Sequence, residues 1–383
     1  MINKRVLVSG ASVGGPALAY WLHRYGFDVT VVEKAHGIRR GGQAVDFKGP
    51  IHRRVLSEMG VLDEVRAAHV VDTDSRIVNA KGRTVGVIPA AFSGGEINIP
   101  RGDLARILYG LTSQTCEYVF GDSITSLTQT HTGVDVTFAR GEPRAFDLVI
   151  GADGMHSNVR KLAFGPEADH VTHLGYHYVL ADLGTGDESV VYNEPGRTVG
   201  LGGSKAPAFF VFASDQLHDR DDVDTQKETL VNAYRDGRWR IPELLAKIPD
   251  ATDFFMDSIS RVTLERYSTG RVALVGDSAW GNALGGFGTG LAVVGAYVLA
   301  GELAVADGDH TVAFPRFEAK FREYASVSQK INAGRLLAPR SGPGIVGRNL
   351  LFTALKVFGP AVKILEGPAK KIELEGYPAL RTV

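Results

Sequence analysis

Cysteine is almost absent from this sequence, in which Cys116 stands alone among 383 residues. A single thiol cannot form an internal disulfide, and no CxxC pair is present for zinc binding or dithiol chemistry. These absences exclude a disulfide reductase, which needs two redox cysteines, and they are typical of a reducing compartment. We therefore expect a cytoplasmic protein.

Long apolar runs and an excess of charge of one sign are also missing. No uninterrupted apolar stretch approaches the roughly 20 residues that span a bilayer, so we expect no transmembrane segment. The short apolar run near the N-terminus leads directly into a folding motif rather than a signal peptide. With 42 basic and 43 acidic residues, the formal net charge is −1. Nucleic acid and anionic membrane surfaces are therefore poor candidate partners.

Glycine, in contrast, is abundant, with 46 residues. This content favours tight turns and close approach of the backbone to a ligand. Apolar residues make up 44% and charged residues 22% of the chain, as in an ordinary globular protein. The length predicts two domains, or one nucleotide-binding domain with a large insertion.

Hydrophobic periodicity predicts an α/β fold. The first 35 residues alternate as strand, glycine turn, helix and strand, whereas the short strands within 171–215 favour an antiparallel sheet in a second domain. Further helices are predicted over 52–59, 103–112, 225–247, 289–306 and 313–335. A last helix has its apolar stripe at Val346, Leu350, Leu351, Ala354, Leu355, Phe358, Val362 and Leu365. We interpret that stripe as packing on the core rather than as gating a substrate site.

A glycine-rich turn, GASVGG at residues 10–15, follows the first predicted strand and opens a helix. Its small residues allow a pyrophosphate to approach the free N–H groups at the helix N-terminus. Glu33 ends the next strand about 20 residues later, where a carboxylate can bind ribose hydroxyls. Ser12 replaces the middle glycine of the usual motif, and its hydroxyl could contact phosphate. Lys34 beside Glu33 favours a ribose diol over a 2′-phosphate, but FAD and NAD are not separated by this motif.

Two later motifs are more specific. DLVIGADGMHSNVR at 147–160 places Asp153 at a tight turn after an apolar strand, and Ser157 and Arg160 can tie that turn to the following helix. GRVALVGDSA at 270–279 ends a buried strand at Asp277, whose carboxylate suits polyol hydroxyls. The run GGFGTG that follows opens a long helix, and N–H groups at a helix start can stabilise negative charge.

In this order, the three motifs resemble those of the group A flavoprotein (FAD-dependent) aromatic monooxygenases, the p-hydroxybenzoate hydroxylase family, over roughly residues 1–335. The resemblance implies a Rossmann-like, glutathione-reductase-type FAD-binding domain (1–72, 97–168 and 258–335). It also implies an antiparallel β-sheet substrate domain (73–96 and 169–257) and a C-terminal helix and tail (336–383). The short chain and the stretch GGQAVDFKG at 41–49 are similar to the tetracycline-inactivating monooxygenases.

The resemblance also implies the chemistry. In that family NADPH or NADH, a transient co-substrate, reduces FAD, O2 adds at flavin C4a, and the hydroperoxide hydroxylates an electron-rich molecule. We expect a phenolic or polycyclic substrate, a tetracycline-like polyketide among the candidates, and a monomer or homodimer. The flavin carries the reaction, so no catalytic side chain and no metal is assigned. The residues expected at the cofactor are Gly10, Ser12, Val13, Gly14, Gly15, Glu33, Lys34, Arg40, Arg101, Asp153, Asp277, Gly288, Thr289 and Gly290, with Trp280, Gly286 and Phe287 at the substrate cavity.

Some of these assignments leave alternatives open. Trp280 stands where the family often has histidine, and it either lines the cavity or packs under the loop as a buried aromatic residue. Asp153 is interpreted mainly as a residue that organises the fold. Arg101 precedes a helix, and the resemblance implies contact with the ribityl or pyrophosphate group.

The sequence also leaves three rival functions open. A flavin-dependent halogenase keeps a WxWxIP motif, of which GRWRIP at 237–242 has only the second half. A flavoprotein reductase shares the fold and much of the motif pattern, but does not need O2. A non-enzymatic FAD-binding protein would bind flavin that NADH and NADPH never reduce.

Overall fold

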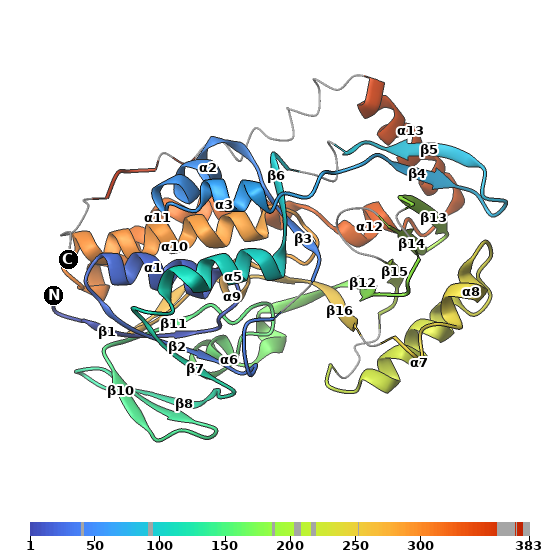
Figure 1. Ribbon diagram of the computed structural model, residues 1–383. Coiled ribbons are helices and arrows are strands. Elements are labelled where there is room, and N and C mark those ends of the chain that lie inside the picture. Colours follow the sequence, from blue (N-terminus) through green and yellow to red (C-terminus); the bar gives the residue numbers. More distant parts are fainter. Residues whose placement is uncertain are drawn as a thin grey trace.

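The structure, a computed structural model, describes residues 1–39, 42–90, 95–185, 188–202, 208–215, 220–251, 253–357, 372 and 374–377. Two large sheets organise it, one of six strands and one of seven (Figure 1). The mixed α/β architecture expected from the sequence is confirmed.

The six-stranded sheet has the order β17-β18-β11-β1-β2-β7 and is parallel except for the β17–β18 pair. Its strands are β1 (Arg5–Ser9), β2 (Asp28–Glu33), β7 (Glu117–Phe120), β11 (Leu148–Gly151), β17 (Ser268–Thr269) and β18 (Val272–Leu274). Strands buried on both faces read as apolar runs, which is why VLV in β1 and LVI in β11 are fully buried.

Helices cover one face of this sheet, and smaller elements cover the other (Figure 1). The first group is α1 (Gly14–Arg24), α5 (Arg101–Thr112), α10 (Gly288–Val305) and α11 (His310–Ala325). The second is α6 (Asn158–Phe164) and the three-stranded sheet of β8 (Ile124–Gln129), β9 (Val134–Phe138) and β10 (Arg144–Phe146). The antiparallel pair β3 (Ala44–Phe47) and β6 (Ile97–Pro100) contacts α10 through β3, and α3 (Leu62–Ala67) and α5 through β6. Helix α2 (Gly49–Glu58) packs on α3 and α10, and the short α9 (Asp277–Trp280) contacts the strand Phe254–Val262.

Helix α10 is the one described helix long and apolar enough to cross a membrane by length and composition. However, 78% of that stretch is buried inside the protein. It packs against α1 and α11 in the core, and this position accounts for its apolar composition.

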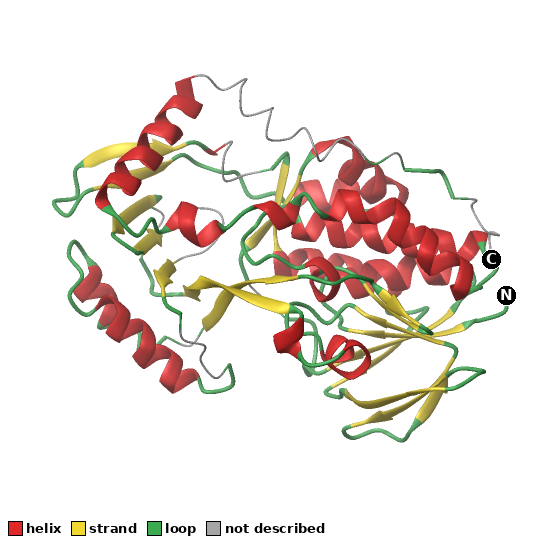
Figure 2. Cartoon of the chain, turned by 180° about the vertical axis from the view of Figure 1, so that it is seen from behind, coloured by secondary structure: helices red, strands yellow, loops and turns green. Residues whose placement is uncertain are grey.

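The seven-stranded sheet has the order β16-β12-β15-β14-β13-β4-β5, and all its pairs are antiparallel except β13–β4. Its strands are β4 (Ser75–Val78), β5 (Thr84–Ile88), β12 (Val171–Ala181), β13 (Val190–Glu194), β14 (Arg197–Leu201), β15 (Ala208–Ala213) and β16 (Phe254–Val262). Helices α7 (Val223–Tyr234) and α8 (Ile241–Leu245) form a separate layer on its outer face (Figure 2). Strand β16 runs across the domain boundary that the sequence placed at 257–258.

Two predicted helices are broken. The helix expected over 225–247 is α7 and α8, because the chain turns between them at Trp239, whose φ is +56°. The helix expected over 313–335 ends at Ala325 and is followed by a 3-10 turn and by α12 (Ala333–Leu337). The Asn332 side chain accepts a hydrogen bond from the Arg335 N–H group and so caps a new helix.

The predicted packing face of the last helix was wrong. In α13 (Gly342–Val357), Val346, Leu350 and Leu351 are 59%, 65% and 49% exposed. The helix packs instead through Phe352, which is 1% exposed, and through the buried Arg348. The side chains of residues 355–357 and all of 358–371 lie outside the described residues, so the stripe beyond Ala354 is not placed.

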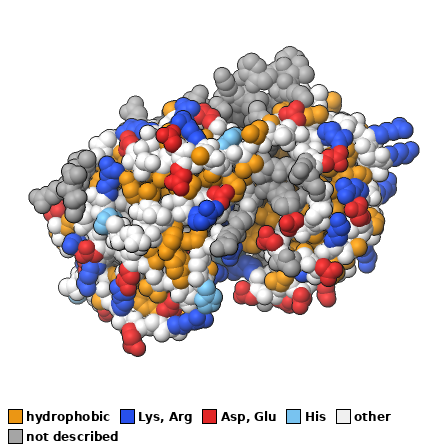
Figure 3. Space-filling view, in the orientation of Figure 1, with side chains coloured by type: hydrophobic (Ala, Val, Ile, Leu, Met, Phe, Trp, Pro, Cys, Tyr) orange, Lys and Arg blue, Asp and Glu red, His pale blue; other side chains and the backbone are white. Residues whose placement is uncertain are grey.

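The surface carries both charge signs. Figure 3 shows Lys, Arg, Asp and Glu side chains interspersed over the face it presents. This pattern agrees with the near-zero net charge of the chain.

Candidate active site

The three motifs meet at one edge of the six-stranded sheet. The turn at Gly10 follows β1, Asp153 follows β11, and Asp277 follows β18. Because these strands are parallel neighbours, their carboxyl ends lie side by side, although up to 267 residues separate the turns in sequence (277 − 10). The carboxyl edge of an open parallel sheet is where such folds bind ligands.

Close backbone contacts shape the glycine turn. Gly10 has a φ of +106°, and a Cβ atom there would lie 2.5 Å from the Ala152 carbonyl oxygen. A Cβ atom on Gly15 would lie 1.8 Å from the Gly10 carbonyl oxygen, so only glycine fits. Helix α1 begins at Gly14 without a side-chain cap from any described residue. Its first N–H groups are therefore available to an anion.

Glu33 is tied to the backbone on both sides of the turn. Its Oε2 accepts a hydrogen bond from the Ala11 N–H at 2.8 Å, and its Oε1 accepts one from the Ala35 N–H at 2.9 Å. Carboxylate oxygens accept more than one hydrogen bond each, so ribose hydroxyls can still be bound. Lys34 is exposed, and Arg40 lies outside the described residues.

Asp153 holds its own loop together. Ser157 Oγ donates to Asp153 Oδ1, and the Val159 N–H donates to Oδ2 at 3.0 Å. The buried Arg160 guanidinium donates to the Ser278 carbonyl oxygen at 3.0 Å and thereby connects the second motif to the third. Burial raises the pKa of Asp153. These contacts favour the role of Asp153 in organising the fold.

Asp277 lies deep in the site, but its carboxylate has no hydrogen-bond partner among the residues that the structure describes. Burial raises the pKa of Asp277, and the positive charge of Arg101 opposes that rise. Arg101 reaches the glycine turn, where its Nε donates to Ser12 Oγ at 3.2 Å. A desolvated carboxylate without a protein partner, next to a cation and a helix N-terminus, fits a ligand that has both hydroxyl and phosphate groups. FAD is such a ligand.

The start of α10 borders the same space. Phe287 precedes the helix with a φ of +63°, and no described side chain caps the first turn. A Cβ atom on Gly288 would lie 3.4 Å from Asp277 Oδ1, which places this helix start against the third motif. The N–H groups of residues 288–290 are therefore available to a partly negative atom.

His52 supports this helix start and was missed in the sequence. A Cβ atom on Gly290 would lie 2.1 Å from His52 Cε1, so the ring packs directly against the helix. Its Nδ1 accepts a hydrogen bond from the Lys48 N–H at 3.0 Å, so we place the ring proton on Nε2, 3.1 Å from Tyr324 Oη. Burial lowers the pKa of His52 to about 4, so the ring is neutral near pH 7. A lone histidine in a helix gives no sequence signal of this role.

The second half of the site is the inner face of the seven-stranded sheet. Val179, Phe210 and Met256 point to the outer core, so the alternating residues Tyr178, Phe209 and Phe255 point the other way. Much of that inner face is covered by α12 and α13, but Tyr178, Leu180 and Phe209 keep part of their surface open, and Phe255 is 37% exposed. An open, aromatic sheet face suits a flat apolar ligand.

A polar cluster joins the two sheets. His156, from the second motif, lies 2.9 Å from Glu167 Oε1 through Nδ1 and 3.0 Å from both Asp257 oxygens through Nε2. Asp257 is on β16, so the imidazole connects the substrate sheet to the second motif loop. Burial raises the pKa of Asp257 to about 6. Polar residues in a strand are common, which is why the sequence did not single out Asp257.

Comparison with known proteins decides the family. The family described as "FAD binding domain" matches residues 3–310, most of the chain. The chain belongs to this family.

The relatives of this FAD-binding protein include enzymes. A flavin-dependent monooxygenase of Legionella longbeachae serogroup 1 (strain NSW150) is 36% identical over 342 residues, covering 86% of this chain and 87% of the relative. An uncharacterised protein of Mycobacterium tuberculosis (strain H37Rv) is 39% identical over 354 residues, covering 85% and 92%. The protein is a flavin-dependent monooxygenase of the group A type, as its motifs indicated.

Solved structures agree with this placement. The crystal structure of tetracycline destructase Tet(55) superposes with a TM-score of 0.82 at 33% identity and covers 98% of this chain and 99% of its own. Tetracycline destructase Tet(51) gives a TM-score of 0.84 at 28% identity, with 98% and 100% covered.

The two notable tryptophans of this monooxygenase lie outside the site. Trp280 is 1% exposed and packs on Phe317 and Phe321, which favours the packed aromatic alternative over a cavity-lining one. Trp239, in the half motif shared with halogenases, packs on Tyr192 at the outer layer of the substrate sheet. Of the other residues expected at the cavity, Gly286 is exposed and Phe287 is half-buried beside Lys48.

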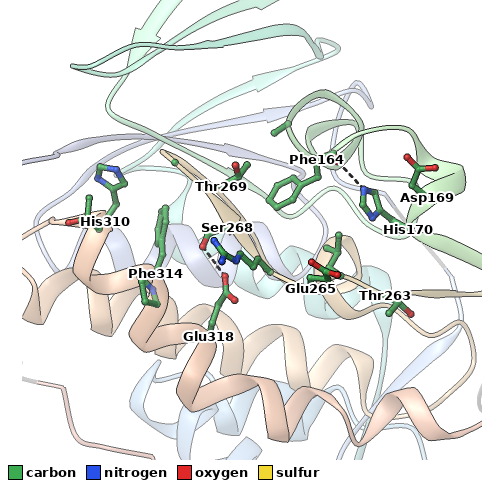
Figure 4. A pocket seen from close by; sticks show the side chains of 16 residues that line it. Phe164, Asp169, His170, Thr263, Glu265, Ser268, Thr269, His310, Phe314 and Glu318 are labelled. Atoms are coloured by element: carbon green, nitrogen blue, oxygen red, sulfur yellow. Dashed lines mark hydrogen bonds between the residues drawn. The ribbon is translucent and has the colours of Figure 1, made fainter.

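A groove of about 1030 Å³ lies in a different place. It is lined from α6, β17 and α11, with Phe164, Phe314 and Glu318 on its walls (Figure 4). Thr269 and Gly270 in its lining precede β18, whereas Asp277 follows β18. The groove therefore opens at the opposite end of that strand, and no residue expected at the cofactor lines it.

Proposed function

We propose that this flavin-dependent monooxygenase uses NADH or NADPH and O2 to hydroxylate a phenolic or polycyclic substrate in the cytoplasm. The observation that carries the proposal is the meeting of Ser12, Arg101 and Asp277 at the carboxyl edge of a parallel sheet, where the second motif also contacts the aromatic sheet through His156 and Asp257. In this proposal the three segments 1–72, 97–168 and 258–335 form the cofactor domain.

The residues of this edge have distinct tasks in the proposal. The first turn of α1 and Arg101 hold the pyrophosphate, Glu33 holds the adenosine ribose, and Asp277 accepts hydrogen bonds from the ribityl hydroxyls. The N–H groups of residues 288–290 stabilise negative charge at the flavin ring. Bound FAD supplies the activation of oxygen, while these residues bind it, orient it and exclude water.

A tetracycline-like polyketide is the substrate class that we propose first. The open part of the substrate sheet offers Phe209, Phe255 and Leu180 as a flat apolar surface. Two structural neighbours are named tetracycline destructases. A polycyclic molecule with phenolic and enolic oxygens matches such a surface better than a small polar metabolite does.

Oxidation of NADH and NADPH by the FAD-loaded protein, with and without tetracycline or 1-naphthol, tests the proposal. We expect either compound to accelerate oxidation and to yield a product heavier by one oxygen atom, measured by mass spectrometry with catalase present. Product formed equally well without O2 would identify a reductase instead. Flavin that neither nicotinamide reduces would identify a non-enzymatic FAD-binding protein.

The variant Asp277→Ala tests the cofactor site separately. It removes a charged acceptor from the ribityl chain, so we expect the affinity for FAD to fall by about tenfold or more. The apoprotein should not lose stability, because this carboxylate is buried without a described partner. Flavin titration and thermal unfolding measure the two effects. Asp63→Ala, at a carboxylate 98% exposed, is the matched control, and equal flavin affinity in both variants would contradict the assignment.

A further inference from the structure

Tyr178 occupies the boundary between the substrate sheet and the cofactor edge. It lies opposite Asp257 of β16 and Val211 of β15 in the antiparallel register, so the three share the inner face. Its side chain is surrounded by protein but keeps part of its surface accessible. A residue that is both enclosed and accessible lines an internal space.

The Tyr178 hydroxyl has no hydrogen-bond partner among the described parts of the chain. Burial raises the pKa of Tyr178 above its ordinary value of 10, so the group is a neutral phenol at any working pH. A neutral phenol can donate one hydrogen bond and accept others. Enclosed hydroxyls normally have partners, so this one is suited to a bound molecule.

Tyr178 lies near the second motif, because it is opposite Asp257, whose carboxylate is 3.0 Å from His156 Nε2. The charges of Asp257, Arg101 and Asp277 all act on its hydroxyl. Arg101 and Asp277 belong to the cofactor edge, whereas Asp257 is already engaged by His156 at 3.0 Å. Tyr178 is therefore the polar group of the inner sheet face that is both near the cofactor and uncommitted to another described residue.

The rest of the open face is apolar. Leu180 follows two residues later on β12, Phe209 lies opposite Leu180 on β15, and Phe255 lies opposite it on β16. The Phe255 and Tyr178 rings have centroids 5.8 Å apart. The face thus has a polar end towards the cofactor and an apolar end away from it.

Tyr176, two residues earlier on the same face, shows what a structural tyrosine looks like in this sheet. It is 2% exposed, its ring lies 5.3 Å from the Arg340 guanidinium, and it packs against Gly334 of α12. Tyr178, in contrast, is only partly buried, and no described arginine lies over its ring.

We propose that Tyr178 hydrogen-bonds a phenolic or enolic oxygen of the substrate and so sets the ring that carries this oxygen next to the flavin. The remaining rings lie on Leu180, Phe209 and Phe255. Ring carbons ortho and para to such an oxygen are the electron-rich ones, so this orientation selects where oxygen is added. The assignment rests on the proposed function and adds to it a residue that determines substrate orientation.

The experiment compares Tyr178→Phe with the wild-type holoenzyme and with Tyr176→Phe as the matched control. The probes are 1-naphthol and naphthalene, which differ only in the hydroxyl group. Dissociation constants come from the change in flavin absorbance on binding, and coupling from hydroxylated product per NAD(P)H consumed. FAD content and thermal stability are measured in parallel.

We expect Y178F to weaken 1-naphthol binding by about tenfold, the effect of one hydrogen bond, and to leave naphthalene binding unchanged. More NAD(P)H should end as hydrogen peroxide, because a misoriented ring is not hydroxylated. Y176F should match the wild type in the ratio of the two affinities.

Two results would overturn the assignment alone: an unchanged ratio in Y178F despite wild-type turnover, or an equal loss of both probes. A wild-type holoenzyme that neither binds nor oxidises 1-naphthol or tetracycline would instead overturn the proposed function, and this assignment with it.

Discussion

The cofactor edge and the substrate face of this monooxygenase are built in opposite ways. At the edge, loops from distant parts of the chain touch each other, and a Cβ atom on Gly10 or Gly15 would overlap a carbonyl oxygen. On the substrate face, side chains such as Leu180 and Phe209 stand on regular strands and keep part of their surface open.

This difference separates two kinds of constraint. The edge needs one backbone shape, because helix N–H groups must converge on one ligand. The sheet face needs only its hydrogen-bonded ladder, so its inner side chains can change without breaking the fold. Substrate preference is thus free to vary on a scaffold that retains FAD.

Among the variants that test this contrast, Gly15→Ala should have the largest effect. Its Cβ atom would lie 1.8 Å from the Gly10 carbonyl oxygen, so the turn cannot keep its shape. We expect loss of bound flavin and a fall in the free energy of unfolding of more than about 4 kcal/mol. Denaturant unfolding and the flavin content of purified protein measure both.

Gly14→Ala is the control, because the nearest atom to its Cβ would be Ala292 Cβ at 3.7 Å, an ordinary contact. Its free energy of unfolding should stay close to that of the wild type. Equal destabilisation by the two substitutions would show that the close contact at Gly15 does not make the glycine turn more constrained than its surroundings.

Phe352→Ala tests the cover of the substrate sheet and should have a smaller effect. Phe352 is 1% exposed and packs with Ile77 and Ile88, so its loss leaves a cavity that costs about 3 kcal/mol. Hydrogen exchange should speed up in α13 and not in α1. Leu350→Ala, at a side chain 65% exposed, should change stability by less than about 0.5 kcal/mol. A larger loss of stability in Leu350→Ala than in Phe352→Ala would mean that α13 packs through the face predicted from the sequence.

Asp257→Asn tests the polar connection between the two regions and should have the smallest effect. Burial raises the pKa of Asp257 from 3.8 to about 6, so protonation stabilises the fold at low pH and this contribution is lost as pH rises through 6. Asparagine mimics the protonated acid and can still accept from His156. The stability of D257N relative to wild type should therefore grow between about pH 4 and pH 6, by no more than about 2 kcal/mol, and stay constant above that range.

Thermal unfolding of both proteins across this pH range gives the difference. A difference that stays constant or shrinks between about pH 4 and pH 6 would mean that the ion pair with His156 outweighs the burial of Asp257.

Prediction from the sequence succeeded where the local structure requires a particular type of residue. GASVGG, Asp153 and Asp277 follow strands whose apolar runs are visible in the sequence, and the structure brings these turns together. The sequence left Trp280 open between two positions, and packing against α11 decided for the buried one. The prediction failed for α13, which turns its leucines to solvent. An apolar stripe marks a helix face but does not say which neighbour covers it.

The sequence by itself determined the three turns and their order along the chain, because turns that approach a phosphate or a polyol require particular residues at fixed spacing. The family and the choice of FAD followed from the resemblance of these motifs to those of known monooxygenases. Only the tertiary structure decided which residues share the inner face with Tyr178, and that His52 supports the start of α10. Strand register and helix docking depend on contacts between residues far apart in the chain, and a periodicity of two or of 3.6 residues carries no information about the partner.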